Sequence, residues 1–366
     1  MKLLKSVKEW FITRMGVSNN DKIKIPQFNI LSLPSLARDH ILRIMDFQEI
    51  MMLSFCSKKT VETLGISRAL GCPNKIFIKL SECFSEILLY SETKNVFYGW
   101  HFSQLGEWRR GWKYPIDNKM WTIKGGKYLI DTTLEPSRPR NYIYSEGPHD
   151  EKSINSMFSH FVTCFPKCQV EDICVVVTHA EEHFQVRNIL TPISEVNKLT
   201  IGVLKSNEDL LWILKNMRIS KMFRLELLKD KLQNQQIKKL DCSDLIMSTD
   251  SGWAHGDVLL NLNCIESIFH NSLFTSEDIM GFLRQWKRSE GVEMRRIRIL
   301  KIELNVLLDL DLVELGATPW DAIERSISWF PGINFDEGWD IRRADGLVGT
   351  MVMLERFWFG FFVFDN

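Results

Sequence analysis

The chain has 366 residues, of which 45% are hydrophobic, and its 46 Lys and Arg residues balance its 46 Asp and Glu residues. A hydrophobic fraction of this size supports packed cores, and the length suggests two or three domains. A formal net charge of zero gives no general attraction to nucleic acid or to an anionic membrane surface.

The eight Cys residues are unevenly spaced, and the sequence has no secretory hydrophobic segment. No apolar run approaches the roughly 20 residues that a membrane-spanning helix needs. Free thiols in a reducing compartment are the natural expectation. We therefore expect an intracellular protein of the cytoplasm or the nucleus, without a membrane span.

Residues 1–27 begin with an amphipathic pattern over residues 1–16, in which one face carries Leu3, Leu4, Val7, Trp10 and Phe11. Lysines occupy other positions of this segment, so a helix at a membrane surface is one interpretation. A short helix that packs on the protein's own body is the commoner outcome, and we prefer it.

Residues 28–73 form a compact cassette for which we predict three helices. Pro34 suits the first turn of a helix that runs to residue 45, with one apolar face at Ala37, Ile41, Ile44 and Met45. Asp46 and Glu49 can cap the second helix, and a third lies near Val61 and Leu64. So small a unit cannot bury all its apolar side chains, and we expect several of them in an interface.

Residues 74–150 are predicted to be rich in β-structure. Strands are expected at Ile76–Leu80, Ile87–Tyr90, Val96–Phe102, Met120–Ile123 and Tyr128–Ile130, the last two joined by a turn at Gly125-Gly126. A helix over Lys152–Phe165 follows.

Residues 151–335 alternate between strand and helix patterns. The strands are predicted at Ile173–Val177, Leu199–Val203, Arg224–Leu228, Lys238–Cys242, Cys264–Phe269 and Ile297–Leu304, with helices at Glu208–Lys215 and Ser276–Lys287. Strand, helix and strand in succession imply parallel pairing through crossover connections. We therefore expect an irregular α/β array, similar to leucine-rich repeats, without a strict repeat length.

Residues 336–366 are predicted to form a C-terminal β-hairpin that caps the array. Asp345-Gly346 is a turn signal between Trp339–Arg343 and Thr350–Leu354, and Phe357–Phe364 is apolar on both faces, as in a covered strand. Such a cap protects an open sheet edge. The expected fold class is therefore α+β or α/β.

Motifs for catalysis are lacking. The sequence has no Gly-x-Ser-x-Gly elbow, no phosphate-binding glycine-rich loop with Lys and no His-Glu-x-x-His helix. The spacing of a zinc finger is approximated by Cys164, Cys168, His179 and His183. Because Ile173–Val177 between these pairs predicts a buried strand of a larger sheet, we expect no metal, no cofactor and no catalytic residue.

The cassette contains a series of short motifs in a fixed order: Leu33-Pro34, Ile41-Leu42, the acidic Asp46, Leu53-Ser54 and Cys56-Ser57-Lys58-Lys59. This order resembles the F-box, in the variant of the large nematode F-box families. The resemblance implies docking on the Skp-type adaptor of a cullin ubiquitin ligase. The adaptor-binding residues that it implies are Leu31, Leu33, Pro34, Leu36, Ile41, Leu42, Ile50, Leu53 and Cys56.

Several separated blocks of residues 74–366 resemble the F-box-associated type 2 region. They are Trp212 within Asp209–Lys215, Leu259–Asn263, Leu273–Ile279 followed by Phe282–Lys287, and Trp339–Gly346. The resemblance implies that residues 74–366 recognise a client protein that is to be ubiquitinated.

Array proteins bind through one exposed face and its bordering loops. We therefore assign client binding to a polar loop with Trp253, His255 and Asp257 and to a basic helix with Arg284, Lys287 and Arg288. The plainer interpretations are an ordinary polar loop and a solvated helix face that nearby acidic residues neutralise.

Two functions from different classes compete. The first is a non-catalytic substrate-recognition adaptor of a cullin-type (SCF) ubiquitin ligase. The second is a nucleic-acid-binding module that depends on zinc or on the basic patch. Zero net charge and the imperfect finger spacing favour the first, and an enzyme ranks third because no nucleophile with an adjacent base is visible.

Overall fold

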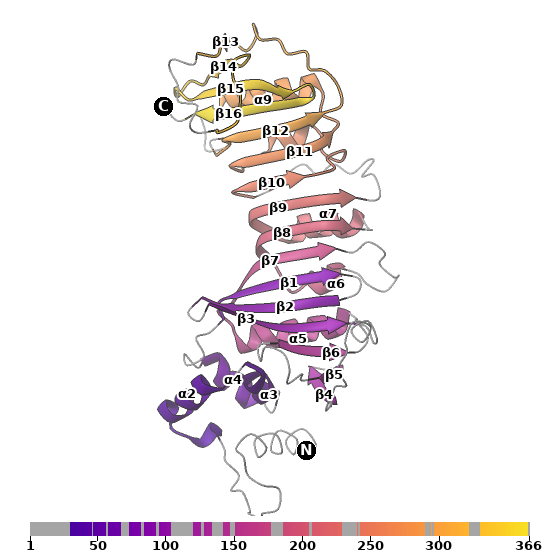
Figure 1. The fold of residues 1–366 in the computed structure, drawn as a ribbon, viewed down its shortest axis with the longest axis vertical. Helices are drawn as coiled ribbons and strands as arrows, with labels where there is room; N and C mark the ends of the chain where they lie inside the picture. The colour runs from indigo at the N-terminus through magenta and orange to yellow at the C-terminus, as the bar shows by residue number, and fades with distance from the viewer. Residues whose placement is uncertain are drawn as a thin grey trace, which may run out of the picture. The chain divides into compact units, whose positions relative to one another are not determined.

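The protein has a mixed α/β fold, as the sequence predicts (Figure 1). The computed structural model describes residues 30–45, 47–55, 58–66, 73–81, 84–92, 95–103, 120–125, 128–133, 142–146, 151–176, 186–204, 207–228, 240, 242–289, 294, 296–321 and 330–364. The amphipathic segment over residues 1–16 lies outside these residues, as do Asp46 and Cys56. The chain divides into two compact units, residues 1–171 with 181–192 and residues 172–180 with 193–366.

Three short α-helices follow a 3-10 turn, η1 (Ile30–Ser32), in the first unit: α2 (Ser35–Ile44), α3 (Phe47–Ser54) and α4 (Lys58–Ile66). Pro34 precedes α2, and its carbonyl oxygen accepts the first helical hydrogen bond, from the Arg38 N–H at 3.0 Å. The helix ends where Met45 adopts an extended conformation. The three helices therefore lie where periodicity predicts them.

The face of α2 that packs inward differs from the predicted one. Leu42 is 1% exposed and is the buried residue of this helix, whereas Ile44 is 72% exposed. Ile44 follows Leu42 by two residues, which rotates it by about 200° around the helix axis. Ile44 thus lies on the side opposite Leu42, and the half-buried Ile41 lies between these two directions.

The sheet of the first unit has the strand order β1-β2-β3-β6-β5-β4. Its strands are β1 (Lys75–Ser81), β2 (Phe84–Ser91), β3 (Val96–Ser103), β4 (Met120–Gly125), β5 (Tyr128–Thr133) and β6 (Tyr142–Glu146). The first three pair antiparallel, and β6 pairs parallel to β3. Strand β6 is not among the predicted strands, because a five-residue run carries little periodicity.

Helix α5 (Glu151–Cys164) packs on this sheet and forms the core of the first unit. Its Phe161 ring meets the Trp100 ring of β3 edge-on, with 5.9 Å between ring centroids. Alternate residues of β1 are buried, namely Ile76, Ile78 and Leu80, because successive side chains of a strand point to opposite faces. A short helix, α6 (Val186–Leu190), also belongs to this unit.

The second unit is built on parallel strands, and β7 carries the chain into it after residue 171. The strands are β7 (Gln169–Val176), β8 (Glu195–Leu204), β9 (Arg218–Leu228), β10 (Leu245–Ser248), β11 (Glu266–Ser272) and β12 (Ile299–Leu304). Each pairs in parallel with the next. The predicted parallel pairing is therefore confirmed.

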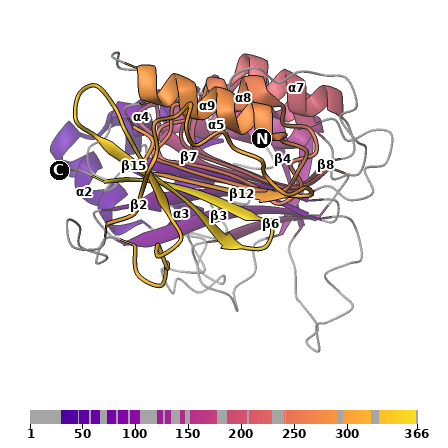
Figure 2. The same cartoon turned by 90° about the horizontal axis from the view of Figure 1, so that it is seen from above.

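The helices α7 (Asn207–Asn216), α8 (Gly256–Leu260) and α9 (Ser276–Arg288) lie along one face of this sheet (Figure 2). Helix α9 begins with a capping box, in which Asp278 N–H donates to Thr275 Oγ1 and Thr275 N–H donates to Asp278 Oδ2. Its buried residues Ile279, Phe282, Leu283 and Trp286 recur at helical spacing.

One predicted strand is wrong. Leu240 and Cys242, the described residues of the predicted strand Lys238–Cys242, are buried but are not part of the sheet. The Cys242 thiol donates to the carbonyl oxygen of Lys221 at 2.7 Å, and the chain bends at Ser243 and Asp244 before β10 begins at Leu245. Leu240 and Cys242 alternate with charged residues as in a strand, but the burial of these two side chains does not require pairing in the sheet.

The C-terminal strands add antiparallel to β12 in the order β12-β16-β15-β14-β13. They are β13 (Thr318–Pro319), β14 (Trp339–Arg342), β15 (Val348–Glu355) and β16 (Trp358–Phe364). The predicted C-terminal hairpin and covered strand are confirmed. Phe361 of β16 packs on Trp286 of α9, and the next residue, Phe362, packs on Phe335.

Gly349 of β15 gives a direct test of this packing. A Cβ atom at this position would lie 2.3 Å from Phe361 Cζ and 3.1 Å from Trp286 Cη2. We predict that Gly349→Ala lowers the free energy of unfolding by about 1–3 kcal/mol, because overpacking forces its neighbours to shift. Equilibrium urea denaturation measures this change.

Gly281→Ala in α9 is the matched control, because its Cβ atom would lie 3.9 Å from Leu260 Cδ2, an ordinary contact. This variant should gain roughly 0.5–1 kcal/mol from the higher helix propensity of Ala. Equal destabilisation by both substitutions would contradict the described packing of β15 against Phe361.

Candidate functional site

Two large apolar side chains of α2 are left on the surface of the first unit. Leu36 is 84% exposed and Ile44 is 72% exposed. Single exposed apolar residues are ordinary, but both of these belong to one ten-residue helix. Of the other predicted adaptor-binding residues, Pro34 is exposed, and the half-buried ones are Leu31, Leu33, Ile41 and Leu53.

Two of the predicted adaptor-binding residues are placed elsewhere by the structure. Leu42 and Ile50 are both buried within the first unit, so neither side chain is available to a partner. They are core residues of the helical segment, and this corrects the prediction made for them. Cys56, the remaining predicted residue, lies outside the described part of the chain.

The end of α3 is joined to α5 and β3 through the half-buried His160. Phe55, directly after α3, stacks on the His160 ring with 4.3 Å between centroids, and it meets Trp100 edge-on at 5.7 Å. Ser54 Oγ lies 2.7 Å from His160 Nε2 and donates to the Met51 carbonyl oxygen at 2.6 Å. Cys164 Sγ lies 3.5 Å from the same ring nitrogen.

A Ser, a His and a Cys within hydrogen-bond distance suggest a nucleophile with its base, but burial works against this chemistry. Burial raises the pKa of the Cys164 thiol to about 12 and lowers the pKa of His160 to about 4. The thiol therefore stays neutral, and a thiolate is the reactive form of Cys. We conclude that Ser54, Phe55, His160 and Cys164 form a packed contact between the end of α3 and α5, called the His160 joint below.

The zinc-finger spacing finds no support in the described residues of its two pairs. Cys164 is part of the joint with His160, and Cys168 Sγ donates to the Pro73 carbonyl oxygen at 2.8 Å. Within the described residues, no cluster of three or more His, Cys, Asp or Glu side chains could hold a metal ion. His179 and His183 lie outside those residues.

The polar loop predicted to bind a client is only partly on the surface. Trp253 is 2% exposed, and its indole Nε1 donates to Ser248 Oγ at 3.1 Å. It is therefore a core residue and not a client contact, which corrects the prediction. His255 and Asp257 are exposed, at the N-cap and the first turn of α8.

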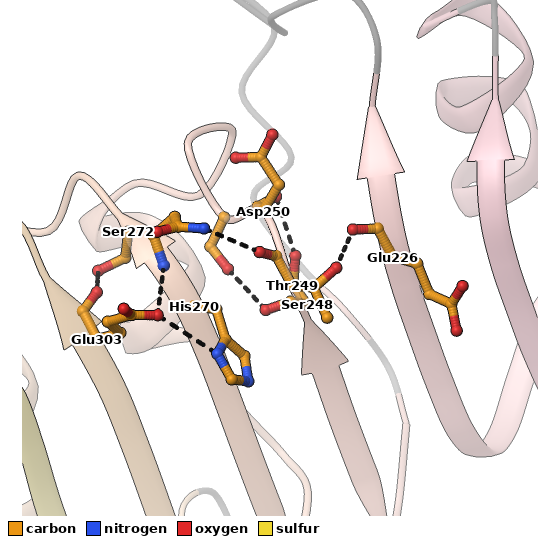
Figure 3. Close-up of polar contacts among 9 residues, drawn as sticks. Glu226, Ser248, Thr249, Asp250, His270, Ser272 and Glu303 are labelled. Carbon is orange, nitrogen blue, oxygen red and sulfur yellow. Dashed lines mark hydrogen bonds and ion pairs between the residues drawn. The ribbon is translucent and has the colours of Figure 1, made fainter.

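A polar network joins the carboxyl ends of the parallel strands beside this loop (Figure 3). Asn271 Nδ2 donates to the Thr249 carbonyl oxygen at 3.3 Å, and Thr249 Oγ1 donates to the Glu226 carbonyl oxygen. Ser272 Oγ donates to the Glu303 carbonyl oxygen at 2.7 Å, and His270 Nδ1 lies 3.3 Å from Glu303 Oε2. Most of these bonds satisfy backbone groups at strand ends, so the network orders the loops.

A pocket of about 580 Å³ lies beside α9 in the second unit, lined by Arg284, Lys287, Arg288, Glu314, Leu315, Arg342, Arg343 and Ala344. It brings together the three basic residues predicted to bind a client. Arg342 and Arg343 were missed as site residues, because they follow Arg288 by more than fifty positions and reach the pocket only through the pairing of β14 with β15. The two adjacent Arg residues in the sequence are the local feature that could have marked them as site residues.

Charge pairs hold two of the arginines in the pocket wall. Arg284 contacts both oxygens of Glu314, with Nε–Oε1 at 2.6 Å and Nη2–Oε2 at 2.8 Å, and its Nη1 lies 2.6 Å from Glu277 Oε1. These hydrogen bonds lower the pKa of the Glu314 carboxyl. The buried Arg343 binds both Asp345 oxygens and lies over the Trp286 ring at 5.2 Å. Bidentate pairs of this kind fix geometry.

No helix among the described residues is long and apolar enough to cross a membrane.

Comparison with known proteins gives one distant relative. The chain is 19% identical over 339 residues to an uncharacterized protein of Caenorhabditis elegans, and the alignment covers 89% of this chain and 75% of the relative. No family model matches the chain, and no solved structure matches it.

The His160 joint predicts a loss of stability in acid. The pKa of His160 in the native protein, about 4, lies below its ordinary value of 6.5. Between these pH values the unfolded chain binds a proton that the native joint does not. Stability contributed by this site is therefore complete above pH 6.5 and declines as the pH falls, by on the order of 3 kcal/mol below pH 4.

Denaturant titrations at pH 7 and pH 4.5 measure this loss, and His160→Gln should reduce the difference between the two pH values. His40→Gln, at an exposed His of α2, is the matched control and should keep the wild-type difference. An unaltered pH dependence in His160→Gln would show that this ring is not the group responsible.

Proposed function

We propose that this protein is a non-catalytic substrate-recognition subunit of a cullin-type ubiquitin ligase. Residues 28–73 would act as the F-box that binds the Skp-type adaptor, and the second unit would bind the client protein. The proposal places the protein inside the cell. The observation that carries it is the exposure of Leu36 and Ile44 on α2.

The first unit supports docking on α2 because the inward side of the helical segment is already occupied. Leu42, Ile50 and Met51 are buried. The Phe55 ring, directly after α3, stacks on the His160 ring of α5. Among the described residues of this segment, the large apolar side chains that remain exposed are Leu36 and Ile44 of α2. An adaptor can therefore bind there without disturbing the core of this unit.

The size of the exposed side chains is compatible with this role. Complete burial of a Leu or Ile side chain contributes about 1.5–3 kcal/mol, and a few such anchors dominate a typical interface. Two anchors surrounded by the half-buried Leu33 and Ile41 supply enough apolar contact for a specific but reversible complex.

The second unit supports client binding through its parallel strands, which we propose to be an irregular array similar to leucine-rich repeats. Helices cover one face of this sheet, and ordered loops and the basic pocket border it. A rigid scaffold with varied loops at one edge is the usual arrangement for recognition.

The nucleic-acid-binding alternative has less support. Its zinc version needs a Cys164 thiolate, whereas the pKa of this thiol is raised to about 12 by burial. Nucleic-acid binding by the basic patch would use a pocket in which Arg284 and Arg343 are already paired with carboxylates. A phosphate backbone is contacted by an extended row of cations, which this pocket does not offer.

We predict that the double variant Leu36→Ala, Ile44→Ala weakens binding to the purified Skp-type adaptor at least tenfold, because each substitution removes apolar area from the interface. Isothermal titration calorimetry with the full-length chain measures the affinity. Circular dichroism should be unchanged, since both side chains are exposed.

The matched control is Leu307→Ala with Val313→Ala, which removes two exposed apolar side chains from the second unit. Its adaptor affinity should equal that of the wild type. If the α2 variant binds the adaptor as tightly as this control does, α2 is not the docking face.

A further inference from the structure

The pocket beside α9 carries positive charge that its own carboxylates do not match. Glu277 and Glu314 both pair with Arg284, and Asp345 pairs with Arg343, so three carboxylates face the five cations Arg284, Lys287, Arg288, Arg342 and Arg343. Lys287 Nζ donates to the carbonyl oxygen of Leu315 at 2.6 Å, which is a neutral acceptor.

Arg288 and Arg342 are the pocket cations that pair with no carboxylate among the described residues. Both side chains are exposed. Arg288 does interact with the charge of Glu314, whose carboxyl pKa is lowered by Arg284 first and by Arg288 to a smaller extent. Glu314 is already bound on both oxygens by Arg284.

Helix stability accounts for part of this pattern. Lys287 and Arg288 lie in the last turn of α9, where the helix dipole favours cations without any ligand. Arg342 has no such reason, because it lies at the end of strand β14. Its side chain is exposed and lines the pocket.

We propose that this pocket binds a phosphate group carried by a side chain of a partner polypeptide, with Arg288 and Arg342 as its two guanidinium ligands and Lys287 as an additional cation. The five cations and three carboxylates named above leave two unmatched positive charges among the described residues. Two positive charges suit a group that carries nearly two negative charges at neutral pH better than a carboxylate, which carries one. Guanidinium groups also match phosphate oxygens in bidentate geometry.

The pocket has the size and the rigidity that such a ligand requires. Its volume of about 580 Å³ exceeds that of one phosphate group and leaves room for adjoining residues of a peptide. Its wall is held by the Arg284–Glu314 pair and by Arg343 over Trp286. A wall that is already ordered loses little conformational entropy on binding.

Phosphate recognition at this pocket does not depend on the adaptor, whereas the identification of the phosphorylated partner as a client rests on the proposed function. The two claims can therefore fail separately. An experiment on the full-length chain without the adaptor tests the pocket alone.

The probe is a fluorescein-labelled pool of twelve-residue peptides, degenerate around a central phosphoserine, compared with the same pool around serine. Fluorescence anisotropy should show at least tenfold tighter binding of the phosphoserine pool to the wild type, and inorganic phosphate should compete. Arg288→Gln with Arg342→Gln should abolish this preference. Arg218→Gln with Arg356→Gln, at exposed arginines that do not line the pocket, removes the same charge and should keep it.

Equal binding of the two pools, or a preference that survives in the pocket variant, would overturn the inference. Stronger competition by a single-stranded oligonucleotide than by the phosphoserine pool would overturn the polypeptide source in favour of a nucleic-acid backbone. Adaptor affinity of the pocket variant, measured in parallel, should equal that of the wild type. Loss of phosphate binding with intact adaptor binding therefore leaves the proposed function standing.

Discussion

The alternation of side chains along β16 is the constraint on which the second unit depends. Phe361 packs on Phe282 and Trp286 of α9, with ring centroids 5.6 Å and 5.0 Å apart, whereas Phe362 packs on Phe335, at 5.3 Å. Because neighbouring residues of a strand point to opposite faces, one strand anchors both the helix layer and the segment around Phe335. Gly349 leaves the space that Phe361 fills.

The same packing shapes the basic pocket. Trp286 is held by Phe361, and the guanidinium of Arg343 lies over its ring, so the core residue that stabilises α9 also positions the pocket wall. In the first unit, His160 has a comparable place: it ties α3 to α5, and the occupied inner side leaves Leu36 and Ile44 of α2 outside. In each unit, the packing of the core therefore determines which side chains remain at the candidate surface.

Local patterns predict much of this fold. The capped and strongly amphipathic α9, the alternating strand β1 and the apolar β16 all have periodicities that identify them without tertiary information. Orientation is harder, because α2 is apolar on more than one side and only its packing in the first unit selects Leu42 over Ile41 and Ile44. The polar residues around Trp253 likewise predict a surface position, whereas its side chain is buried. Arg342 joins Arg288 only through strand pairing that no local pattern specifies.

Hydrogen exchange on the full-length chain, with and without the purified Skp-type adaptor, tests the central claim most directly. If the protein is a recognition subunit that docks through α2, adaptor binding slows amide exchange in peptides from residues 30–55, and peptides from residues 256–304 exchange at their unbound rates. Protection confined to the second unit, or the absence of a complex at micromolar concentrations of both proteins, would contradict the account.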